Sequence, residues 1–289
     1  MYQTILSATE LQTLVASGEP LTIFDASFEL MQPFAGDQQY LQTHIAGAVR
    51  ADLNRHLSAL HDAASAGQCA SGGRHPLPTR EAFAQWLGSI GFSADMQAVV
   101  YDRQGGVYCG RLWWMLKWLG VEAAAVLDGG LSAWQAVGGA VAAGEEAVRT
   151  ACTFAARAPL LELTSADAVL QRLGRPEQTL IDARAPARFR GEVEPLDPVA
   201  GHIPGALNRP TAQNFASDGK FKSADVLRAE FDALLAGRDP ATVVHHCGSG
   251  VSAIPNVLAM AIAGLPAGAL FAGSWSEWCA NPVRPVARG

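Results

Sequence analysis

The sequence predicts an α/β protein of two tandem domains, each a mainly parallel β-sheet flanked by helices on both faces. Three observations lead to this prediction. Short apolar strands alternate with helical patterns along the whole chain, the second half repeats motifs of the first, and one strand of the second half leads directly into a glycine-flanked cysteine loop. With 289 residues, 49% of them hydrophobic, the chain is long enough for two ordinary domains.

The internal repeat is carried by four pairs of matching segments. They are Phe24–Ser27 with Ile181–Arg184, His44–Ala48 with His202–Ala206, Val99–Asp102 with Val243–His246, and Leu127–Trp134 with Phe271–Trp278. The spacing between partners is 157 or 158 residues for the first two pairs and 144 for the last two. The first half therefore carries an insertion, which we expect to be centred on residues 67–73.

The alternation of patterns sets the expected elements. Strands are expected at Leu21–Asp25, Ala98–Tyr101, Ala124–Leu127, Thr179–Asp182, Val243–His245 and Ala269–Phe271. Helices are expected at Ala8–Ser17, Thr79–Ile90, Val107–Leu119, Ser165–Leu173, Asp225–Leu235 and Ala253–Ala263. Such alternation implies a largely parallel sheet covered by helices. We place the first domain at residues 1–145, a linker at 146–159 and the second domain at 160–289.

Cys247 has the most informative surroundings in the chain. The expected strand Val243–His245 leads into Cys247, and Gly248 and Gly250 permit a tight loop before the next helix. A loop at a helix N-terminus gathers backbone N–H groups and favours an anion. A thiolate, or a persulfide on the same sulfur, is such an anion, so Cys247 is predicted to be reactive rather than a small core residue.

Composition excludes several other classes of function. The five cysteines lie far apart without a C-x-x-C pair, so neither a zinc site nor a disulfide framework is expected, and we predict no metal and no cofactor. The net charge of −6 argues against nucleic acid as a partner. The uncharged stretch 247–276 is cut by Pro255 and Gly264, so no membrane span is predicted. Residues 1–10 show no signal peptide, which with the sparse cysteines indicates a cytoplasmic protein.

The two halves differ at the position of the cysteine. Arg103 falls where the second half has Cys247, although the loop around it, Asp102–Gly106, is otherwise similar. Cys109 lies within the following helix and is predicted to belong to the core. One half is therefore equipped for thiol chemistry and the other is not, and in open parallel sheets ligands bind at the carboxyl ends of the strands.

These motifs resemble a known family, the two-domain rhodanese-type sulfurtransferases, close to those that use 3-mercaptopyruvate. The resemblance covers nearly the whole chain and is carried by Leu127–Gly130, Arg188–Gly191, His202–Ala206 and Cys247–Ser252. It implies two rhodanese-like domains, the first of them inactive. It also implies that the second-domain cysteine accepts a sulfane sulfur as a persulfide and passes it to a thiol or cyanide acceptor.

The resemblance further implies site residues. Gly248, Gly250, Val251 and Ser252 form the loop that receives the donor, with Ser252 standing where the family commonly has threonine. Arg188 matches the first substrate-binding arginine. A second such arginine would fall near Leu196, so Arg190 or Arg184 is expected to substitute. A Ser–His–Asp relay known from the family would use Ser249, His44 and the nearest plausible acid, Asp37.

Two other functions compete with this prediction. A persulfide carrier or redox-sensing module without turnover would show the same accessible Cys247. A cysteine phosphatase would need a cation six positions after the cysteine to bind phosphate, and that position is Ala253. Because Gly248 and Ser249 carry no charge, we expect the donor to be 3-mercaptopyruvate, with one carboxylate, rather than the dianion thiosulfate.

Overall fold

The computed structural model describes residues 1–59 and 69–289, and the chain folds into two compact units. Unit 1 contains described residues 1–59, 78–160 and 217–220. Unit 2 contains residues 69–77, 161–216 and 221–289. The part of the predicted insertion at 67–68 lies outside the described residues, whereas residues 69–73 belong to unit 2.

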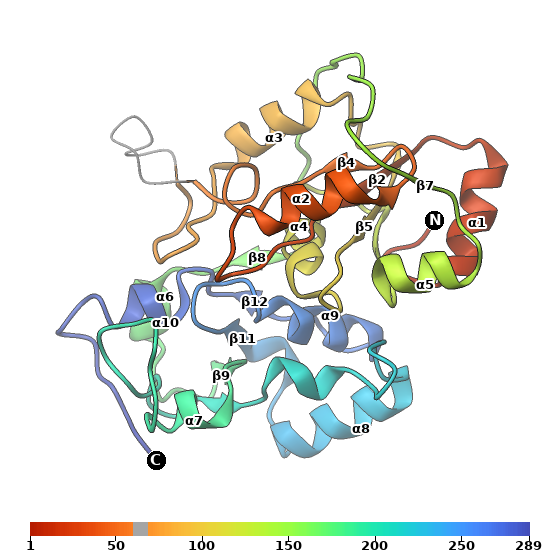
Figure 1. The fold of residues 1–289 in the computed structure, drawn as a ribbon. Helices are drawn as coiled ribbons and strands as arrows, with labels where there is room; N and C mark the ends of the chain where they lie inside the picture. The colour runs from red at the N-terminus through yellow and green to blue at the C-terminus, as the bar shows by residue number, and fades with distance from the viewer. Residues whose placement is uncertain (60–68) are drawn as a thin grey trace. The chain divides into compact units, whose positions relative to one another are not determined.

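Unit 1 is built on a five-stranded parallel sheet with the strand order β1-β6-β5-β2-β4. Figure 1 labels β2, β4 and β5 of this sheet. Its strands are β1 (Ile5–Leu6), β2 (Leu21–Asp25), β4 (Val49–Arg50), β5 (Gln97–Tyr101) and β6 (Ala124–Leu127). Its helices are α1 (Ala8–Ser17), α2 (Ala35–Gln42), α3 (Arg80–Ser89), α4 (Val107–Trp118) and α5 (Gly130–Ala136). A separate antiparallel pair joins β3 (His44–Ile45) to β7 (Val141–Ala142).

Unit 2 repeats this sheet as β10-β9-β11-β12-β8, again parallel throughout. Its strands are β8 (Glu162–Leu163), β9 (Thr179–Asp182), β10 (Leu207–Asn208), β11 (Val243–His246) and β12 (Ala269–Leu270). Its helices are α6 (Ala166–Gln171), α7 (Pro186–Phe189), α8 (Ala224–Leu235), α9 (Ile254–Ile262) and α10 (Ser274–Trp278), with two 3-10 turns at Thr211–Asn214 and Pro240–Thr242.

Each sheet is buried on both faces, as predicted. Successive strand residues point to opposite faces. In unit 1, Ile23 therefore joins the cluster formed with α1 and α5, while Phe24 packs against Trp86 of α3 with 6.2 Å between ring centroids. In unit 2, Val244 packs with α6 and α10, so the next residue, His245, points to the opposite face. All six predicted strands and all six predicted helices are present, with end shifts of at most two residues.

The predicted linker, residues 146–159, runs along unit 1. The N–H of Cys152 donates to the Gly88 carbonyl at 2.8 Å, and the N–H of Arg157 donates to the Leu119 carbonyl at 2.9 Å. The division of the chain by contacts falls after Leu160. The domain limits themselves remain a prediction.

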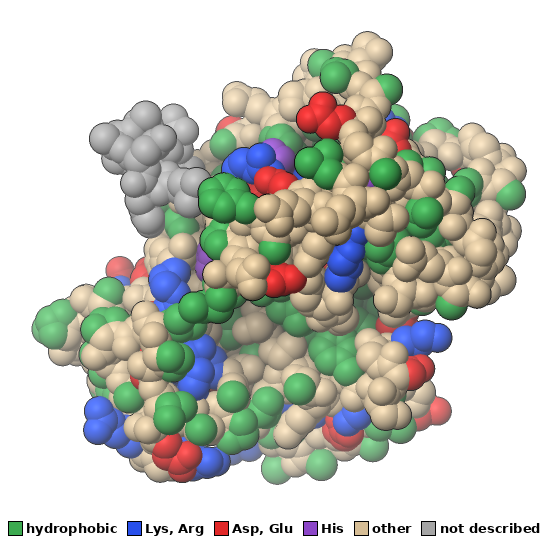
Figure 2. Space-filling model, in the orientation of Figure 1, with side chains coloured by type: hydrophobic (Ala, Val, Ile, Leu, Met, Phe, Trp, Pro, Cys, Tyr) green, Lys and Arg blue, Asp and Glu red, His purple; other side chains and the backbone are tan. Residues whose placement is uncertain are grey.

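Charged side chains of both signs are interspersed on the face drawn in Figure 2. Within the described residues, no helix combines the length and the apolar character that a membrane span requires. In the same part of the chain, no three histidine, cysteine or acidic side chains gather as metal ligands would.

Candidate active site

Cys247 is the first residue after β11, and α9 begins seven residues later at Ile254. This confirms the predicted order of strand, short loop and helix. Pro255 occupies the first turn of α9, where its missing N–H leaves no helical hydrogen bond unmade. The Cys247 side chain is buried, with 1% of the residue exposed.

Helix α10 fixes the conformation of the loop. The carbonyl oxygens of Cys247 and Gly248 each accept a hydrogen bond, at 3.0 Å, from the N–H groups of Trp275 and Ser276. The Cys247 N–H donates to the hydroxyl of Ser274, also at 3.0 Å. Because a peptide group is planar and trans, carbonyls turned toward α10 direct the following N–H groups away from it. The loop thereby presents N–H groups on the side opposite α10.

Ser274 was not predicted from the sequence. It has φ +53°, in the left-handed region that non-glycine residues rarely adopt, and it is fully buried. Its hydroxyl donates to the Phe271 carbonyl at 3.0 Å and lies 4.0 Å from the Cys247 sulfur. Such a backbone position is typical of functional sites, where the surrounding structure holds it in place.

The two loop glycines are required for different reasons. Gly250 has φ +74°, and a Cβ there would lie 2.1 Å from the Ala272 carbonyl oxygen, so no other residue fits. A Cβ on Gly248 would lie 3.1 Å from Nη2 of Arg74 and 3.5 Å from Nη1 of Arg188. Glycine at 248 therefore leaves room for two guanidinium groups beside the cysteine.

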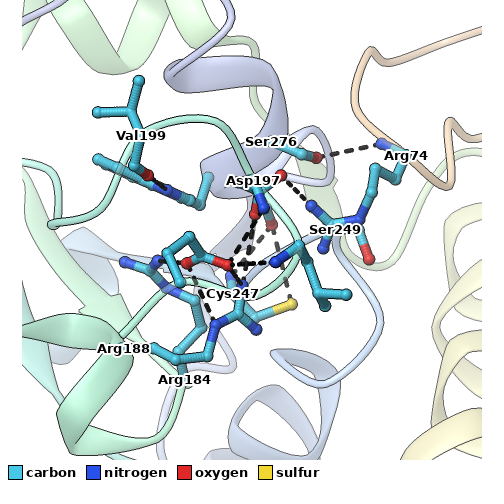
Figure 3. A network of polar contacts seen from close by, with 12 residues as sticks. Arg74, Arg184, Arg188, Asp197, Val199, Cys247, Ser249 and Ser276 are labelled. Carbon is cyan, nitrogen blue, oxygen red and sulfur yellow. Dashed lines mark hydrogen bonds and ion pairs between the residues drawn. The ribbon is translucent and has the colours of Figure 1, made fainter. Parts of the chain in front are cut away.

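The arginines beside the loop are held by buried acids (Figure 3). Arg188, in α7, contacts Glu194 at 2.5 Å and Asp197 at 3.4 Å, and Arg74 pairs with the same Asp197. Both carboxylates are 3% exposed, whereas the side chains of Arg188 and Arg74 are 19% and 30% exposed. The predicted position of Arg188 near the loop is consistent with this arrangement.

Ser249 contacts a histidine that sequence reasoning missed. Its hydroxyl lies 2.8 Å from Nδ1 of His75, and Ser249 is 8% exposed. His75 and Arg74 come from residues 69–77, in the insertion of the first half, yet this segment belongs to unit 2. One feature of the sequence could have pointed to His75: the insertion, which is present in one half only, carries the polar pair Arg74–His75.

His44 and Asp37, predicted for the relay, have other partners in unit 1. The His44 ring stacks on Tyr40, with Nδ1 2.7 Å from the Tyr40 carbonyl oxygen and Nε2 3.1 Å from Glu146. Asp37 pairs with Arg50 at 3.0 Å and with Arg55 at 2.6 Å. The imidazole that the structure brings to Ser249 is that of His75, and a relay through His44 and Asp37 stays a prediction.

The arginines proposed to replace the one missing at Leu196 lie in different environments. Arg184 is buried, forms a 2.7 Å ion pair with Asp182 and stacks over Trp275, so it braces the end of β9. Arg190 has a side chain 45% exposed and pairs with Glu192 at 2.6 Å. Its role in donor binding remains a prediction. Leu196 itself is 38% exposed.

The remaining predicted residues line or support the loop. Val251 is 6% exposed, and the Ser252 carbonyl accepts a hydrogen bond from the Thr211 hydroxyl. The side chain of His246 is fully buried, with Nδ1 3.9 Å from Asp182. Burial lowers the pKa of His246 below its ordinary value, so the ring is neutral at pH 7.

The comparison with known proteins identifies the family. The model of the rhodanese-like domain matches residues 7–137 and 165–281. The chain belongs to the rhodanese-like family. The first match contains β2, β4, β5 and β6, and the second contains β9 to β12, which confirms the tandem fold predicted from the internal repeat.

Full-length relatives of this rhodanese-like chain are sulfurtransferases. A protein of Pseudomonas aeruginosa named "Probable 3-mercaptopyruvate sulfurtransferase" is 43% identical over 99% of this chain and 98% of its own length. The thiosulfate sulfurtransferase of Bos taurus is 31% identical over 96% of this chain and 92% of its own. The SseA structure from Escherichia coli, described as a 3-mercaptopyruvate sulfotransferase, superposes with a TM-score of 0.76 at 33% identity, covering 96% of this chain and all of that one. The prediction of a sulfur-transferring enzyme is thereby confirmed.

Proposed function

We propose that Cys247 is the sulfur carrier of this enzyme and that 3-mercaptopyruvate is its preferred donor. The observation that carries the proposal is the surroundings of Cys247. The thiol lies at the start of a loop presented by α9 and α10, with the Arg74–Arg188 pair and the Ser249–His75 pair beside it. The acceptor would be a small thiol or cyanide, which needs only to reach the terminal sulfur of the persulfide.

The transfer step balances with these groups alone. The Cys247 thiolate attacks the donor sulfur, a bond forms between the two sulfurs, and the carbon–sulfur bond of 3-mercaptopyruvate breaks. The electron pair of that bond leaves with the organic fragment as the enolate of pyruvate, which takes one proton to become pyruvate. We expect Ser249, whose hydroxyl contacts His75, to deliver that proton.

The charges around the loop favour a monoanionic donor. Arg74 and Arg188 contribute two positive charges, and Glu194 and Asp197 contribute two negative charges at contact distance. Arg184 also contacts Glu194, at 3.3 Å, but it is itself paired with Asp182, so the group is neutral before the donor binds. Thiolate attack on thiosulfate brings three negative charges together, whereas 3-mercaptopyruvate adds a single carboxylate that lies away from the sulfur being attacked. Because surroundings without net charge do not offset three gathered negative charges, attack on 3-mercaptopyruvate is expected to be faster than attack on thiosulfate.

The carrier role is tested by intact mass. Exposure to 3-mercaptopyruvate should add one sulfur atom that a thiol reductant removes, and Cys247→Ser should abolish both the addition and the turnover. Because Cys152 is exposed and Cys69 is half-buried, the experiment is run in a Cys69→Ser/Cys152→Ser background, which should behave as wild type. Turnover that survives in Cys247→Ser would refute the mechanism. Sulfur labelling without turnover in the Cys69→Ser/Cys152→Ser protein would indicate a persulfide carrier instead of an enzyme.

Donor preference is tested by kcat/KM for 3-mercaptopyruvate and thiosulfate with a common acceptor. Wild type should favour 3-mercaptopyruvate. A Ser249→Lys variant, and the same change combined with Gly248→Arg, should shift the preference toward thiosulfate. The side chain added at 248 would displace the ends of Arg74 and Arg188, so the single variant is the cleaner measurement. A wild-type preference for thiosulfate would overturn the charge argument but not the carrier role.

A further inference from the structure

The chain that follows the last helix takes the same course in both units up to one point. In unit 1, His44 pairs antiparallel with Ala142. In unit 2, its counterpart His202 bridges Ala287, again antiparallel. Unit 1 then continues with residues 145–154, which hydrogen-bond to its sheet and to α3. No described residue of unit 2 follows an equivalent course.

Glu146, in this continuation, occupies a carboxylate site of unit 1. One of its oxygens accepts the N–H of Gly47 at 2.7 Å and lies 3.1 Å from Nε2 of His44. The Gly47 N–H, with the His44 ring as a smaller cause, lowers the pKa of the Glu146 carboxyl below its ordinary value. The turn and the histidine therefore bind an ionised carboxylate.

Unit 2 repeats this site with a different outcome. The repeat gives His202 and Gly205 as the counterparts of the histidine and the glycine. The His202 ring stacks on Phe189 with 3.9 Å between centroids, and its Nδ1 lies 2.8 Å from the Phe189 carbonyl oxygen, which is the orientation that the unit 1 histidine has. Among the described residues, no group forms a hydrogen bond with Nε2 of His202 or with the N–H of Gly205. A second carboxylate site is therefore open.

A groove of about 520 Å³ begins at this site. It extends from the turn before β10 to the start of β9 and the end of α8, and its lining includes Gln178, Thr179, Pro204, Gly205, Arg238 and Asp239. The counterpart of Thr179 in unit 1 is Thr22, whose hydroxyl accepts a hydrogen bond from Arg149 at 2.9 Å. The groove thus corresponds to the path that residues 145–154 take over unit 1, and an extended peptide fits it.

The groove carries positive charge. Arg175 and Arg238 line it, and no carboxylate among the described residues forms an ion pair with either guanidinium. Asp239, the acidic residue of the lining, accepts the N–H of Ala241 at 2.9 Å. In unit 1 the covering segment brings a cation, Arg149, to this place. In unit 2 the cations belong to the groove itself, so acidic side chains complement it.

We propose that this groove binds an extended acidic segment of a partner protein. One carboxylate of the segment binds between His202 and Gly205, as Glu146 does in unit 1, and further acidic side chains lie against Arg175 and Arg238. The groove lies where β9 and β10 begin, whereas the thiol loop follows the end of β11 in the same parallel sheet. A bound partner therefore leaves the thiol loop open.

The test uses fluorescent peptides with the sequence of residues 145–154. The peptide that carries Arg149→Glu and Cys152→Ser should bind the full chain saturably in fluorescence anisotropy, and added salt should weaken its binding. Two control peptides are matched to it. One also carries Glu146→Gln, and the other keeps Arg149. Each lacks one carboxylate, so each should bind about threefold more weakly or worse.

Protein variants locate the peptide. Arg175→Ala and Arg238→Ala should each weaken binding about threefold, and together about tenfold, with sulfur transfer within about twofold of wild type. Arg228→Ala removes an exposed arginine that is paired with Asp232 on α8, and this matched control should leave binding unchanged. Equal thermal unfolding of all variants establishes that the fold is kept.

Three outcomes would overturn the proposal. The first is no saturable binding of the acidic peptide up to about 1 mM. The second is equal binding to wild type and to the double variant Arg175→Ala/Arg238→Ala. The third is a dimer in sedimentation that the double variant dissociates, because the groove would then be covered by a second copy of this chain.

Discussion

The loop after β5 in unit 1 and the loop after β11 in unit 2 occupy equivalent places in the repeat, but different groups fill them. In unit 1 the carboxylate of Asp102 accepts hydrogen bonds from the N–H groups of Gln104, Gly106, Tyr108 and Cys109, at 2.8–3.0 Å. The carboxylate is buried, with 1% of the residue exposed. The anion that a helix N-terminus attracts is thus built into the chain.

Arg103, which stands where unit 2 has the cysteine, also binds within its own unit. Its guanidinium contacts the Asp25 carboxylate at 3.0 Å, the Ser27 hydroxyl at 2.8 Å, and the carbonyl oxygens of Gln39 and Thr43. The nearby Cys109 is buried, and burial raises the pKa of its thiol well above the ordinary value. The loop after β5 therefore offers neither a thiol at the position of Cys247 nor an open anion site.

Unit 2 differs at both positions. His246 replaces Asp102 and carries no carboxylate, and Cys247 replaces Arg103. In unit 1 the Asp102 carboxylate binds the N–H groups of the loop and helix that follow the strand. In unit 2 the equivalent N–H groups have no such carboxylate, so we expect them to bind an external anion or the sulfur itself. From this comparison we expect these two side chains to decide which copy of the fold carries a reactive thiol.

The largest effect is expected from placing a cysteine in the closed loop. In a Cys247→Ser background, Arg103→Cys should acquire no donor sulfur, because Asp102 already occupies the N–H groups. The unfolding free energy should fall by roughly 3–5 kcal/mol, since buried Asp25 loses its ionic partner. Arg103→Lys, which keeps a cation, should lose less. Mass labelling at residue 103 would show that Asp102 does not close the loop.

The two histidines give the next largest effect. His75→Ala should lower kcat with 3-mercaptopyruvate by about 100-fold or more, because the imidazole next to Ser249 is lost. His44→Ala should instead lower thermal stability and leave kcat within threefold, since both its ring nitrogens are engaged in unit 1. The opposite pattern would support the relay through His44.

Arg188 and Arg103 contrast an arginine that we propose to bind the donor with one that is bound inside the fold. Arg188→Ala should lower kcat/KM for 3-mercaptopyruvate by roughly 10- to 150-fold, the range for one charge-assisted contact. The Arg228→Ala variant again serves as the exposed control. If kcat/KM in Arg188→Ala falls by less than threefold, Arg188 does not bind the donor, and its role is the ion pair with Glu194.

The smallest effect concerns acid stability and follows from the strands themselves. At the positions of Tyr101 and Asp102, unit 2 has His245 and His246, and burial lowers the pKa of His245 to about 3. In the unfolded chain His245 becomes protonated below about pH 6.5, whereas in the folded protein it stays neutral down to about pH 3. This group therefore lowers the unfolding free energy as the pH falls through that window, by about 2 kcal/mol at pH 5.

The measurement for His245 is the slope of stability against pH. His245→Leu, which cannot titrate, should reduce the loss between pH 7 and pH 5 by about 2 kcal/mol whatever its effect at pH 7. Denaturant unfolding of both proteins at each pH gives the difference. Equal slopes in the two proteins would show that another group governs acid unfolding.

The sequence by itself determined the longer elements and placed Cys247, the proposed sulfur carrier, directly after a strand. Period-2 and period-3.6 patterns and helix-end signals are local, so β2, β6, β9 and α1 were predicted with their observed ends. The repeat placed Cys247 against Arg103 by alignment alone. The two-residue edge strands β1, β4, β8 and β10 were missed, because so short a segment carries no periodicity and is defined only by its neighbour in the sheet.

Only the tertiary structure decided which polar side chains surround the cysteine. Arg74 and His75 are distant from Cys247 in the chain and reach it because residues 69–77 pack into unit 2. Arg184 and Arg188 are close in sequence, yet one is buried against Asp182 and the other faces Gly248. Periodicity is a property of neighbouring residues, whereas a site assembled from separate segments depends on long-range packing, which leaves no periodic trace in the sequence.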